Sequence, residues 1–447
     1  MHHGTPPIRK NLQLCGWMLF EHPAHLSIRN KERERMRIAL FYSEVESFNC
    51  FTDLLAAELH TLGHETFILD FKNLLAEGPH SLAYFSEFAA EKVDAAICFD
   101  GLGTREDILI DIWNAYRTVV VDILMDPPLR FHPTLEKHPQ NYLLFCCDRD
   151  HVEYVKKYFG QSVAFVNFMP HVGIMPDKNA PAIPYKEKKY DILFSGTYYR
   201  PESMLAKIEE LFEKGTDVYN FYLSIFECLI KDSSLTIEQA FYNVAKEKNV
   251  SLGEESLKIL LGCSESIDWA IRMYQRDRVV KALADAGLEL HLLGRGWENH
   301  SSAGYPNVHR IDDRIPYIET LAYMADAKIN LNVFPWFKAG THDRIFNTLL
   351  QHSLPLTDSS RWITENFTDG EDIALYDLKH LELLPGIAEK LLHDTEHAEA
   401  IITRGYEKVL RHFTWKNCTD WILNAIHAAS EAYSVPLSSA SRIQSIR

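Results

Sequence analysis

The chain has 447 residues, a formal net charge of −16, and 46 % apolar against 24 % charged residues. This length is too great for one ordinary hydrophobic core and predicts two or three domains of a globular protein. The acidic balance argues against a large nucleic-acid-binding surface but leaves room for a local basic pocket that binds a small anion. The longest apolar runs, such as "TVVVDIL" at 118–124, are far shorter than the roughly 20 residues of a membrane helix, so we expect no integral membrane segment.

The eight cysteines form no CxxC pair, and several of them stand in apolar, strand-like runs. Reduced cysteine behaves there as a small hydrophobe, which indicates a reducing compartment, and we expect a cytoplasmic protein. The first strand-like run begins near Met36, and the sequence before it lacks the pattern of a secretory signal peptide. We therefore expect an N-terminal extension over 1–35, and a flexible tail over 434–447.

The first half of the chain alternates short apolar runs with segments of helical period. The six strand candidates, in chain order, are RIALFY, ETFILDF, VDAAICFD, TVVVDIL, YLLFCC and VAFVNF. Continuous apolar strands separated by helices are typical of a parallel sheet that is covered on both faces. The pattern predicts a doubly wound, Rossmann-like α/β domain over 36–175.

A second domain of the same kind is predicted over 190–404, after a proline-rich, charged linker at 176–189. Its strand candidates are YDILFSG, LELHLLG, AKINLNVF, LPLTD and DIALYD. The helical region between the first two is much longer than an ordinary crossover, so we expect a helical insertion at about 212–263. A C-terminal helix is predicted over 405–433.

Two doubly wound domains joined by one linker enclose a cleft, and ligands of such domains bind outside the carboxyl ends of the strands. One loop of this kind is "GTHDR", which runs from Gly340 to Arg344. Thr341 or Asp343 can cap the following helix, whose N-terminus together with Arg344 suits a diphosphate. The alternative is an ordinary capped surface helix whose arginine pairs with Asp343 or Asp313.

Other strand-end loops of the second half carry glycines or hydroxyl groups. Their candidate residues are Ser195, Gly196, Gly294, Arg295, Gly296, Thr357, Asp358 and Ser359. The glycines allow close approach of the backbone, Trp297 could stack on a base or sugar, and the hydroxyls could bind phosphate or sugar oxygens. The structural alternatives are tight turns, a packed tryptophan and a helix cap.

In the first half, Asp100, Asp126 and His171 follow predicted strands, and each could contact an acceptor hydroxyl or act as its general base. Each could equally be a cap, a turn residue or a solvated charge. The histidines show no HExxH pattern, so we expect no fixed metal site. GxSxG, a P-loop and a complete GxGxxG after the first strand are missing, which argues against an α/β-hydrolase, a P-loop NTPase and a dinucleotide dehydrogenase.

Four stretches occur in a characteristic order: "YDILFSGTYYR", "LELHLLGRGW", "GTHDRIFNTLLQHSLPLTDSSRWITENFTDGEDIALYD" and "ITRGYEKVLRHFTWKNCTDWIL". This ordered set resembles the CgeB-like (spore maturation protein) glycosyltransferases, among the group 1 glycosyl transferases, which have the GT-B fold. The resemblance covers about 190–203 and 265–425, and the first half only in its strand order.

The resemblance implies roles for individual residues. Arg344 matches the arginine at the donor phosphates, 294–296 the loop beside the nucleotide, and 357–359 the turn under the pyrophosphate. Asn347 departs from the pattern, because retaining GT-B enzymes usually carry a glutamate there that holds the ribose hydroxyls. Thr414 matches the closing "HT", with Asn417 in place of the expected arginine.

Together these patterns predict a glycosyltransferase that is metal-independent, needs no cofactor, and by resemblance retains the stereochemistry of its donor. It would move a sugar from a nucleotide-diphospho-sugar, bound by the second domain, to a hydroxyl of a glycan, protein or small-molecule acceptor held by the first. Arg344 and the helix N-terminus, with Gly340, Thr341 and Asn347 beside them, would stabilise the departing diphosphate. The alternatives are a GT-B sugar-nucleotide epimerase or hydrolase, and a catalytically silent nucleotide- or glycan-binding module, for which the argument is Asn347.

Overall fold

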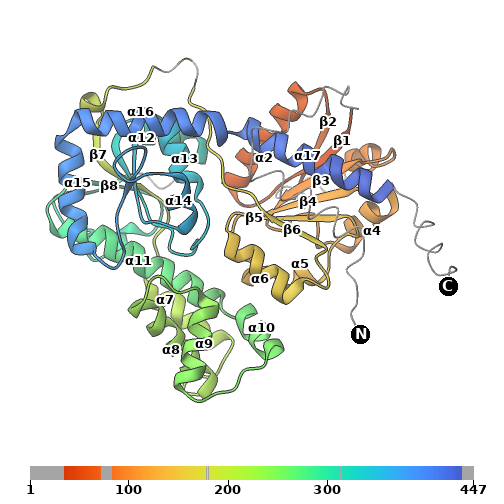
Figure 1. Ribbon diagram of the computed structural model, residues 1–447, viewed down its shortest axis with the longest axis horizontal. Coiled ribbons are helices and arrows are strands. Elements are labelled where there is room, and N and C mark those ends of the chain that lie inside the picture. The colour runs from red at the N-terminus through yellow and green to blue at the C-terminus, as the bar shows by residue number, and fades with distance from the viewer. Residues whose placement is uncertain (1–34, 72–82, 178, 180, 312–314, 435–447) are drawn as a thin grey trace, which may run out of the picture.

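The computed structural model describes residues 35–71, 83–177, 179, 181–311 and 315–434. The predicted N-terminal extension and C-terminal tail therefore lie almost wholly outside the described residues. The described chain forms two α/β lobes, each built around one six-stranded sheet (Figure 1). This is the predicted fold class of two doubly wound domains.

The sheet of the first lobe contains all six predicted strands. They are β1 (Arg37–Tyr42), β2 (Glu65–Asp70), β3 (Ala95–Phe99), β4 (Val119–Leu124), β5 (Tyr142–Cys146) and β6 (Phe165–Phe168). All pairs are parallel, in the order β2-β1-β3-β4-β5-β6. Every residue of β3, β4 and β5 is buried, as their continuous apolar sequences require. The helices of this lobe are α2 (Glu46–Thr61), α4 (Asp107–Tyr116), α5 (His132–Glu136) and α6 (Arg149–Phe159), with the 3-10 turn η1 (Pro128–Arg130) before α5.

The sheet of the second lobe is also parallel throughout. Its strands are β7 (Tyr190–Ser195), β8 (Leu290–Leu293), β9 (Val308–Ile311), β10 (Ala327–Asn332), β11 (Leu354–Thr357) and β12 (Ala374–Leu375). The order is β12-β11-β10-β7-β8-β9, so the direction of strand addition reverses between β7 and β10. β9 was not predicted, because it is an edge strand whose two central residues, His309 and Arg310, are exposed.

The helical insertion consists of α8 (Asp217–Lys231), α9 (Ile237–Glu247) and α10 (Glu254–Gly262), and follows α7 (Pro201–Leu205). Phe241 packs at its centre, with ring centroids 5.8 Å from Phe221 and 5.5 Å from Tyr222. The insertion projects from the second lobe, and α10 reaches the first lobe through the ion pair of Lys258 with Glu136 (2.9 Å) (Figure 1). In the sequence, the insertion lies between β7 and α11 (Glu265–Asp285). It therefore follows the carboxyl end of β7.

The remaining helices are α12 (Tyr317–Ala325), α13 (Asp343–Leu350), α14 (Arg361–Asn366), α15 (Leu384–His393), α16 (Thr395–His412) and α17 (Trp415–Ser434). α17 leaves the second lobe and packs on α2 and β4 of the first (Figure 1). The Trp415 and Phe51 rings are 5.1 Å apart, and Asn417 Oδ1 accepts from the backbone N–H (3.1 Å) and hydroxyl (2.7 Å) of Thr414. Asn417 therefore fixes the start of the crossing helix. None of the helices in the described part of the chain has the length and apolar character needed to span a membrane.

Part of the predicted linker belongs structurally to the second lobe. Tyr185 is buried, and its hydroxyl donates to the carbonyl of Leu391 (3.0 Å). The Lys188 amine is also buried, which lowers its pKa to about 8, and it donates to Ser353 Oγ (2.9 Å). The chain from Tyr185 onward is thus anchored by side-chain contacts rather than spanning freely.

Candidate functional site

The point of strand reversal between β7 and β10 is where ligands of doubly wound sheets bind. Two arginines meet there. Arg344, in the first turn of α13, donates from Nη1 to Oδ1 of Asn332 at the end of β10 (2.6 Å). Arg276, on α11, donates from Nη1 to the carbonyl of Thr197, just beyond β7 (2.6 Å). The guanidinium carbons of Arg344 and Arg276 lie 5.3 and 5.8 Å from the ring centre of Phe194, so one aromatic ring of β7 supports both.

This arginine pair (Arg276 and Arg344) carries uncompensated positive charge. Among the described residues neither guanidinium forms an ion pair, and Arg276 Nε is buried without a hydrogen-bond partner. Burial, the proximity of Arg344 and that of Arg272 lower the pKa of Arg276, and burial likewise lowers the pKa of Arg344. Charged groups that are buried without a counter-ion are costly, and an anion bound between them would offset that cost. The pair can therefore hold a phosphate or diphosphate group.

Two loops of glycines bring the backbone close to the arginine pair. A Cβ on Gly196 would lie 3.3 Å from Nη2 of Arg344, and one on Gly294 would lie 2.4 Å from the carbonyl oxygen of Gly196. Gly294 adopts φ +129°, which L side chains rarely adopt. Ser195, at the end of β7, has a buried hydroxyl with no partner among the described groups. The loop of Gly196 therefore lies against Arg344, the loop of Gly294 packs on it, and Ser195 Oγ is an unpaired donor at the end of the same strand.

Residues 295–297 divide between surface and core. Arg295 is exposed. Gly296 adopts φ +87°, and a Cβ there would clash with the carbonyl oxygen of Tyr198. The Trp297 indole is buried, donates to the carbonyl of Gly196 (2.8 Å) and stacks on Tyr198 at 5.0 Å. The structure therefore contains the packed tryptophan, because Tyr198 covers a face of the indole and the Gly196 carbonyl accepts from its N–H.

The side chains of the turn after β11 bond to the protein itself, and one of them positions the Asn332 side chain that holds Arg344. Thr357 Oγ1 donates to the carbonyl of Asp358 (2.9 Å) and accepts from Nδ2 of Asn332 (2.9 Å). Asp358 Oδ1 accepts from the Phe334 N–H (2.8 Å), and burial raises the pKa of this carboxyl to about 7. Ser359 is exposed, while Ser360 caps α14 through the N–H of Ile363 (3.1 Å). Thr357 thereby orients Asn332, which holds Arg344.

The predicted phosphate role of Gly340 and Thr341 does not agree with their positions. Gly340 forms an antiparallel bridge with Asp148 of the first lobe, and the Thr341 N–H donates to the carbonyl of Cys147 (3.1 Å). Thr341 Oγ1 accepts from the His171 N–H (2.8 Å) and lies 2.9 Å from Nδ1 of the same residue. The α13 N-cap is His342, not Thr341 or Asp343. This part of the loop joins the lobes, and only Arg344 at its end reaches the anion site.

Asn347 is likewise occupied at the lobe junction. Its Oδ1 accepts from the N–H of Ile174 (2.8 Å), and its Nδ2 donates to the hydroxyl of Tyr317 (3.2 Å) and to Oδ2 of Asp343 (3.3 Å). The side chain is 1 % exposed. Ribose binding by Asn347 is therefore not supported by this geometry, because every polar atom of its amide is engaged by the protein.

The three first-lobe candidates differ in their surroundings. Asp126 is ion-paired to Arg130 (3.1 Å) and Arg272 (2.9 Å); burial alone would raise its pKa, but Arg272 and then Arg130 hold the pKa below the ordinary value. A carboxylate stabilised in this way is a poor base, so the two ion pairs argue against a basic role for Asp126, and its contact with an acceptor stays a prediction. Asp100 accepts from the Met125 N–H (2.8 Å), and burial followed by repulsion from Asp126 raises its pKa well above the ordinary range. Asp100 stays a candidate for proton exchange.

Burial lowers the pKa of His171 to about 4, and His171 is 5 % exposed. The unfolded chain, with a histidine pKa near 6.5, binds more protons than the folded protein between about pH 6.5 and 4, so stability falls as the pH drops through this window. The wild type should lose more free energy of unfolding between pH 7 and pH 4.5 than the His171→Gln variant, by up to about 3 kcal/mol. Denaturant unfolding at the two pH values measures this difference. The exposed His412→Gln should keep the wild-type pH dependence; an equal dependence in both variants would contradict the assignment.

A second cluster of charged residues lies beside the arginine pair and contacts both lobes. Arg130 of the first lobe donates from Nε to Asp268 Oδ2 on α11 (3.0 Å), and Arg272 on α11 donates from Nη1 to Asp126 Oδ1 (2.9 Å). Arg272 Nε also donates to Asp268 Oδ1 (3.2 Å). This charge ring (Asp126, Arg130, Asp268 and Arg272) alternates in sign and connects the lobes twice. Its guanidiniums stack on Trp269 and Trp336, with the closest approach 4.1 Å between Arg272 and the Trp336 ring.

Arg276 and the charge-ring residues of α11 were not predicted from the sequence. A usable signal existed, because Arg272 and Arg276 are spaced i, i+4 and alternate with apolar residues such as Ile271 and Met273. Arginines on the apolar face of a helix indicate buried charge. The described residues contain no group of three or more His, Cys, Asp or Glu side chains placed to hold a metal ion.

Comparison with known proteins agrees with this geometry. Residues 275–424 match the family described as glycosyl transferase-like, a span that begins at Gln275 and contains both members of the arginine pair. Among curated proteins, no sequence match was found. The part of the chain from α11 of the second lobe to α17 is therefore similar to this family.

Several solved structures align with most of the chain. Sucrose-phosphate synthase from Thermosynechococcus elongatus aligns with TM-score 0.51 and 10 % identity, over 90 % of this chain and 100 % of that chain. A glycosyltransferase from Rickettsia africae aligns with TM-score 0.46 and 9 % identity, over 90 % and 100 % of the two chains. Anabaena HepE in complex with UDP-glucose aligns with TM-score 0.43 and 10 % identity, over the same shares. The chain has the GT-B fold, while the CgeB-like assignment stays a prediction.

Proposed function

We propose that this protein is a metal-independent glycosyltransferase that moves a sugar from a nucleotide-diphospho-sugar to an acceptor hydroxyl. The observation that carries the proposal is the arginine pair at the strand reversal, in which Arg276 is buried and neither guanidinium forms an ion pair among the described residues; it lies inside a segment that matches the glycosyl transferase-like family. Fixed cations at a departing diphosphate perform the electrostatic work that a metal ion performs elsewhere.

The roles of the residues follow from their positions. Arg276 and Arg344 bind the diphosphate, and Ser195 Oγ is a further donor at the end of β7. In the transfer, the acceptor oxygen forms a bond to the anomeric carbon while the bond from that carbon to the diphosphate oxygen breaks. The bonding electrons remain on the diphosphate, and the hydroxyl proton passes to that group or to solvent. The lobes, held together by the charge ring, exclude water and so favour transfer over hydrolysis.

A nucleotide panel tests the proposal directly. Thermal unfolding is measured with UDP, GDP, ADP, CMP and dTDP and their common sugar conjugates, each with and without EDTA. A ligand at 100 times its dissociation constant adds about 2.7 kcal/mol of stability, which shifts the melting temperature by an easily measured amount. We expect one nucleotide diphosphate to stabilise the protein equally in EDTA.

Two outcomes count against the proposal. Stabilisation that disappears in EDTA would contradict metal independence, and no stabilisation by any nucleotide would contradict the donor site itself. Chromatography coupled to mass spectrometry of the stabilising donor incubated alone separates a transferase from an epimerase or hydrolase, because only the latter two convert the donor without an acceptor. A hydrolase changes the mass of the donor, whereas an epimerase changes only its retention time.

A further inference from the structure

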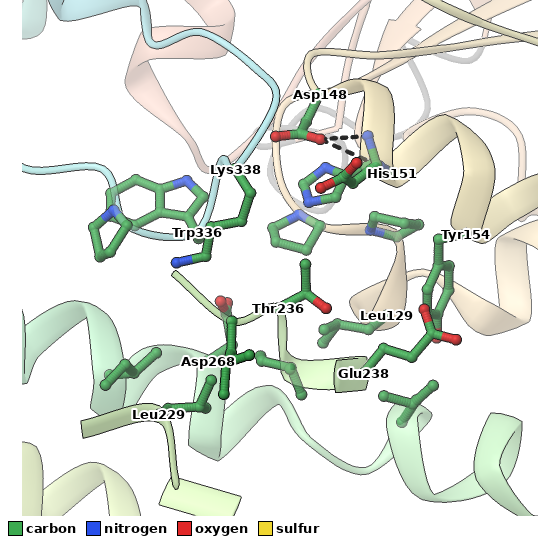
Figure 2. A pocket seen from close by; sticks show the side chains of 18 of the residues that line it. Leu129, Asp148, His151, Tyr154, Leu229, Thr236, Glu238, Asp268, Trp336 and Lys338 are labelled. Atoms are coloured by element: carbon green, nitrogen blue, oxygen red, sulfur yellow. Dashed lines mark hydrogen bonds between the residues drawn. The ribbon is translucent and has the colours of Figure 1, made fainter. Parts of the chain in front are cut away.

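A cavity with about 770 Å³ of empty space, part of it open to solvent, lies between the helical insertion and the first lobe (Figure 2). Its walls come from η1 and α6 on one side, from α8, α9 and α11 on the other, and from the loop after β10. Concave pockets with mainly apolar walls typically hold a small organic molecule. We call it the insertion cavity.

The walls of the insertion cavity are largely apolar. Leu129 of η1, Leu229 of α8 and Ile237 of α9 line it from both lobes, and Trp336 closes one end. The charged groups in the lining already have partners in the protein. Asp268 belongs to the charge ring, and Glu238 is bonded to Lys157 (2.5 Å) and the Tyr158 hydroxyl (2.6 Å). Asp150 pairs with Arg361, Asp148 accepts from backbone N–H groups, and Lys338 donates to the Ser233 carbonyl. The cavity is therefore not built for a cation or for a highly charged ligand.

Two polar atoms in this lining have no partner among the described groups. Gln275 is 0 % exposed; its Oε1 accepts from Arg278 (3.0 Å), but its Nε2 is unpaired. His151 Nδ1 is also buried and unpaired, and burial lowers the pKa of this imidazole, which keeps it neutral at pH 7. A buried polar group left unpaired costs roughly 1–3 kcal/mol, so a ligand oxygen that accepts from Gln275 would be stabilising. Isolated polar atoms on an apolar wall fit a ligand with few hydroxyls.

The insertion cavity ends next to the proposed donor site. Gln275 is the neighbour of Arg276 in α11, and the Trp336 ring centre lies 5.6 Å from the guanidinium carbon of Arg276. Trp336 therefore borders both the insertion cavity and the arginine pair.

We propose that the insertion cavity is the acceptor site, and that the acceptor is a compact molecule with an apolar or aromatic body and a hydroxyl, not an extended hydrophilic glycan. This inference rests on the proposed function. It assigns the helical insertion a role: α8, α9 and α10 supply the wall that determines which acceptors enter.

The test uses 2-naphthol and 4-methylumbelliferone as probes on the full chain, with maltotriose as the hydrophilic alternative. Binding is followed by fluorescence titration, and maltotriose is added as a competitor. We expect at least one aromatic probe to bind with 1:1 stoichiometry, and maltotriose not to displace it. Ile237→Glu, which places a charge in the cavity wall at the start of α9 where an acidic residue favours the helix, should weaken binding at least tenfold. Ile259→Glu, at a 61 % exposed position of α10, should leave binding unchanged.

Thermal unfolding of both variants is also measured with the nucleotide that stabilises the wild type in the panel, and this stabilisation should be the same in each variant. If neither aromatic probe binds, if Ile237→Glu binds as tightly as the wild type, or if maltotriose displaces the probe, the inference is overturned even when nucleotide binding is intact. If no nucleotide stabilises any variant, the proposed function fails instead, and with it the acceptor role.

Discussion

Replacing Asp268 with asparagine is expected to lower the free energy of unfolding by about 3–5 kcal/mol, because it removes one member of a buried ion-pair network and leaves Arg130 and Arg272 with Asp126 as their shared counter-ion. The Asp268 side chain is 1 % exposed and pairs with Arg130 and Arg272, whose side chains are 8 % and 4 % exposed. Both guanidiniums would lose their main counter-ion at once. Denaturant and thermal unfolding measure the loss.

Asp285→Asn is the matched control, because Asp285 is on the same helix and its ion pair with Lys281 lies at the surface. A change within about 0.5 kcal/mol is expected there. A second variant tests the mechanism: combining Asp268→Asn with Arg272→Met should recover part of the lost stability, since the uncompensated charge is removed. Equal effects of Asp268→Asn and Asp285→Asn would show that the charge ring does not hold the lobes together.

The sequence patterns predict the strands well wherever the chain buries both faces of a strand. All residues of β3, β4 and β5 are buried, so their apolar runs are unambiguous. β9 is short and half exposed at an edge, and its sequence "VHRI" carries no such signal. Strand order follows from the alternation of strands and helices in a doubly wound fold, which explains why the fold class could be predicted without any single decisive motif.

The site was predicted only in part, for a physical reason. Arg344 directly follows a strand and a loop, so local sequence places it at the carboxyl edge of the sheet. The positions of Gly340, Thr341 and Asn347 depend instead on how the lobes meet, and the bonds of these residues to Cys147, His171 and Ile174 join segments that are 170 or more residues apart. No local pattern encodes that contact.

Arg276 shows the opposite case, a site residue without a loop. It stands in the middle of α11, beyond the helical insertion, and reaches the carboxyl edge only because the helix extends past the sheet towards the first lobe. Its long side chain then places the guanidinium beside Thr197 and Phe194. The apolar residues around it in the helix indicate burial, but not which groups it approaches.

Arg276→Met and Arg344→Ala are each expected to reduce the rate of transfer by about 10²–10³-fold, the effect of removing one group that stabilises charge in a transition state. Both variants should also lose most of the nucleotide-induced rise in melting temperature. Arg411→Ala, which replaces an exposed arginine that pairs with Glu407 on the surface, should retain both properties.

The melting temperature without ligand separates a binding role from a structural one. Arg276 is 7 % exposed and has no ion pair among the described residues, so replacing it with the similarly sized, uncharged methionine should leave the stability unchanged or raise it by about 1–4 kcal/mol. A residue that stabilised the fold would behave in the opposite way. The anion site would be contradicted if the Arg276→Met variant melts at a lower temperature than the wild type and is still stabilised by nucleotide. A variant that is more stable but no longer binds nucleotide is the result expected of a site in which positive charges destabilise the fold and bind a ligand.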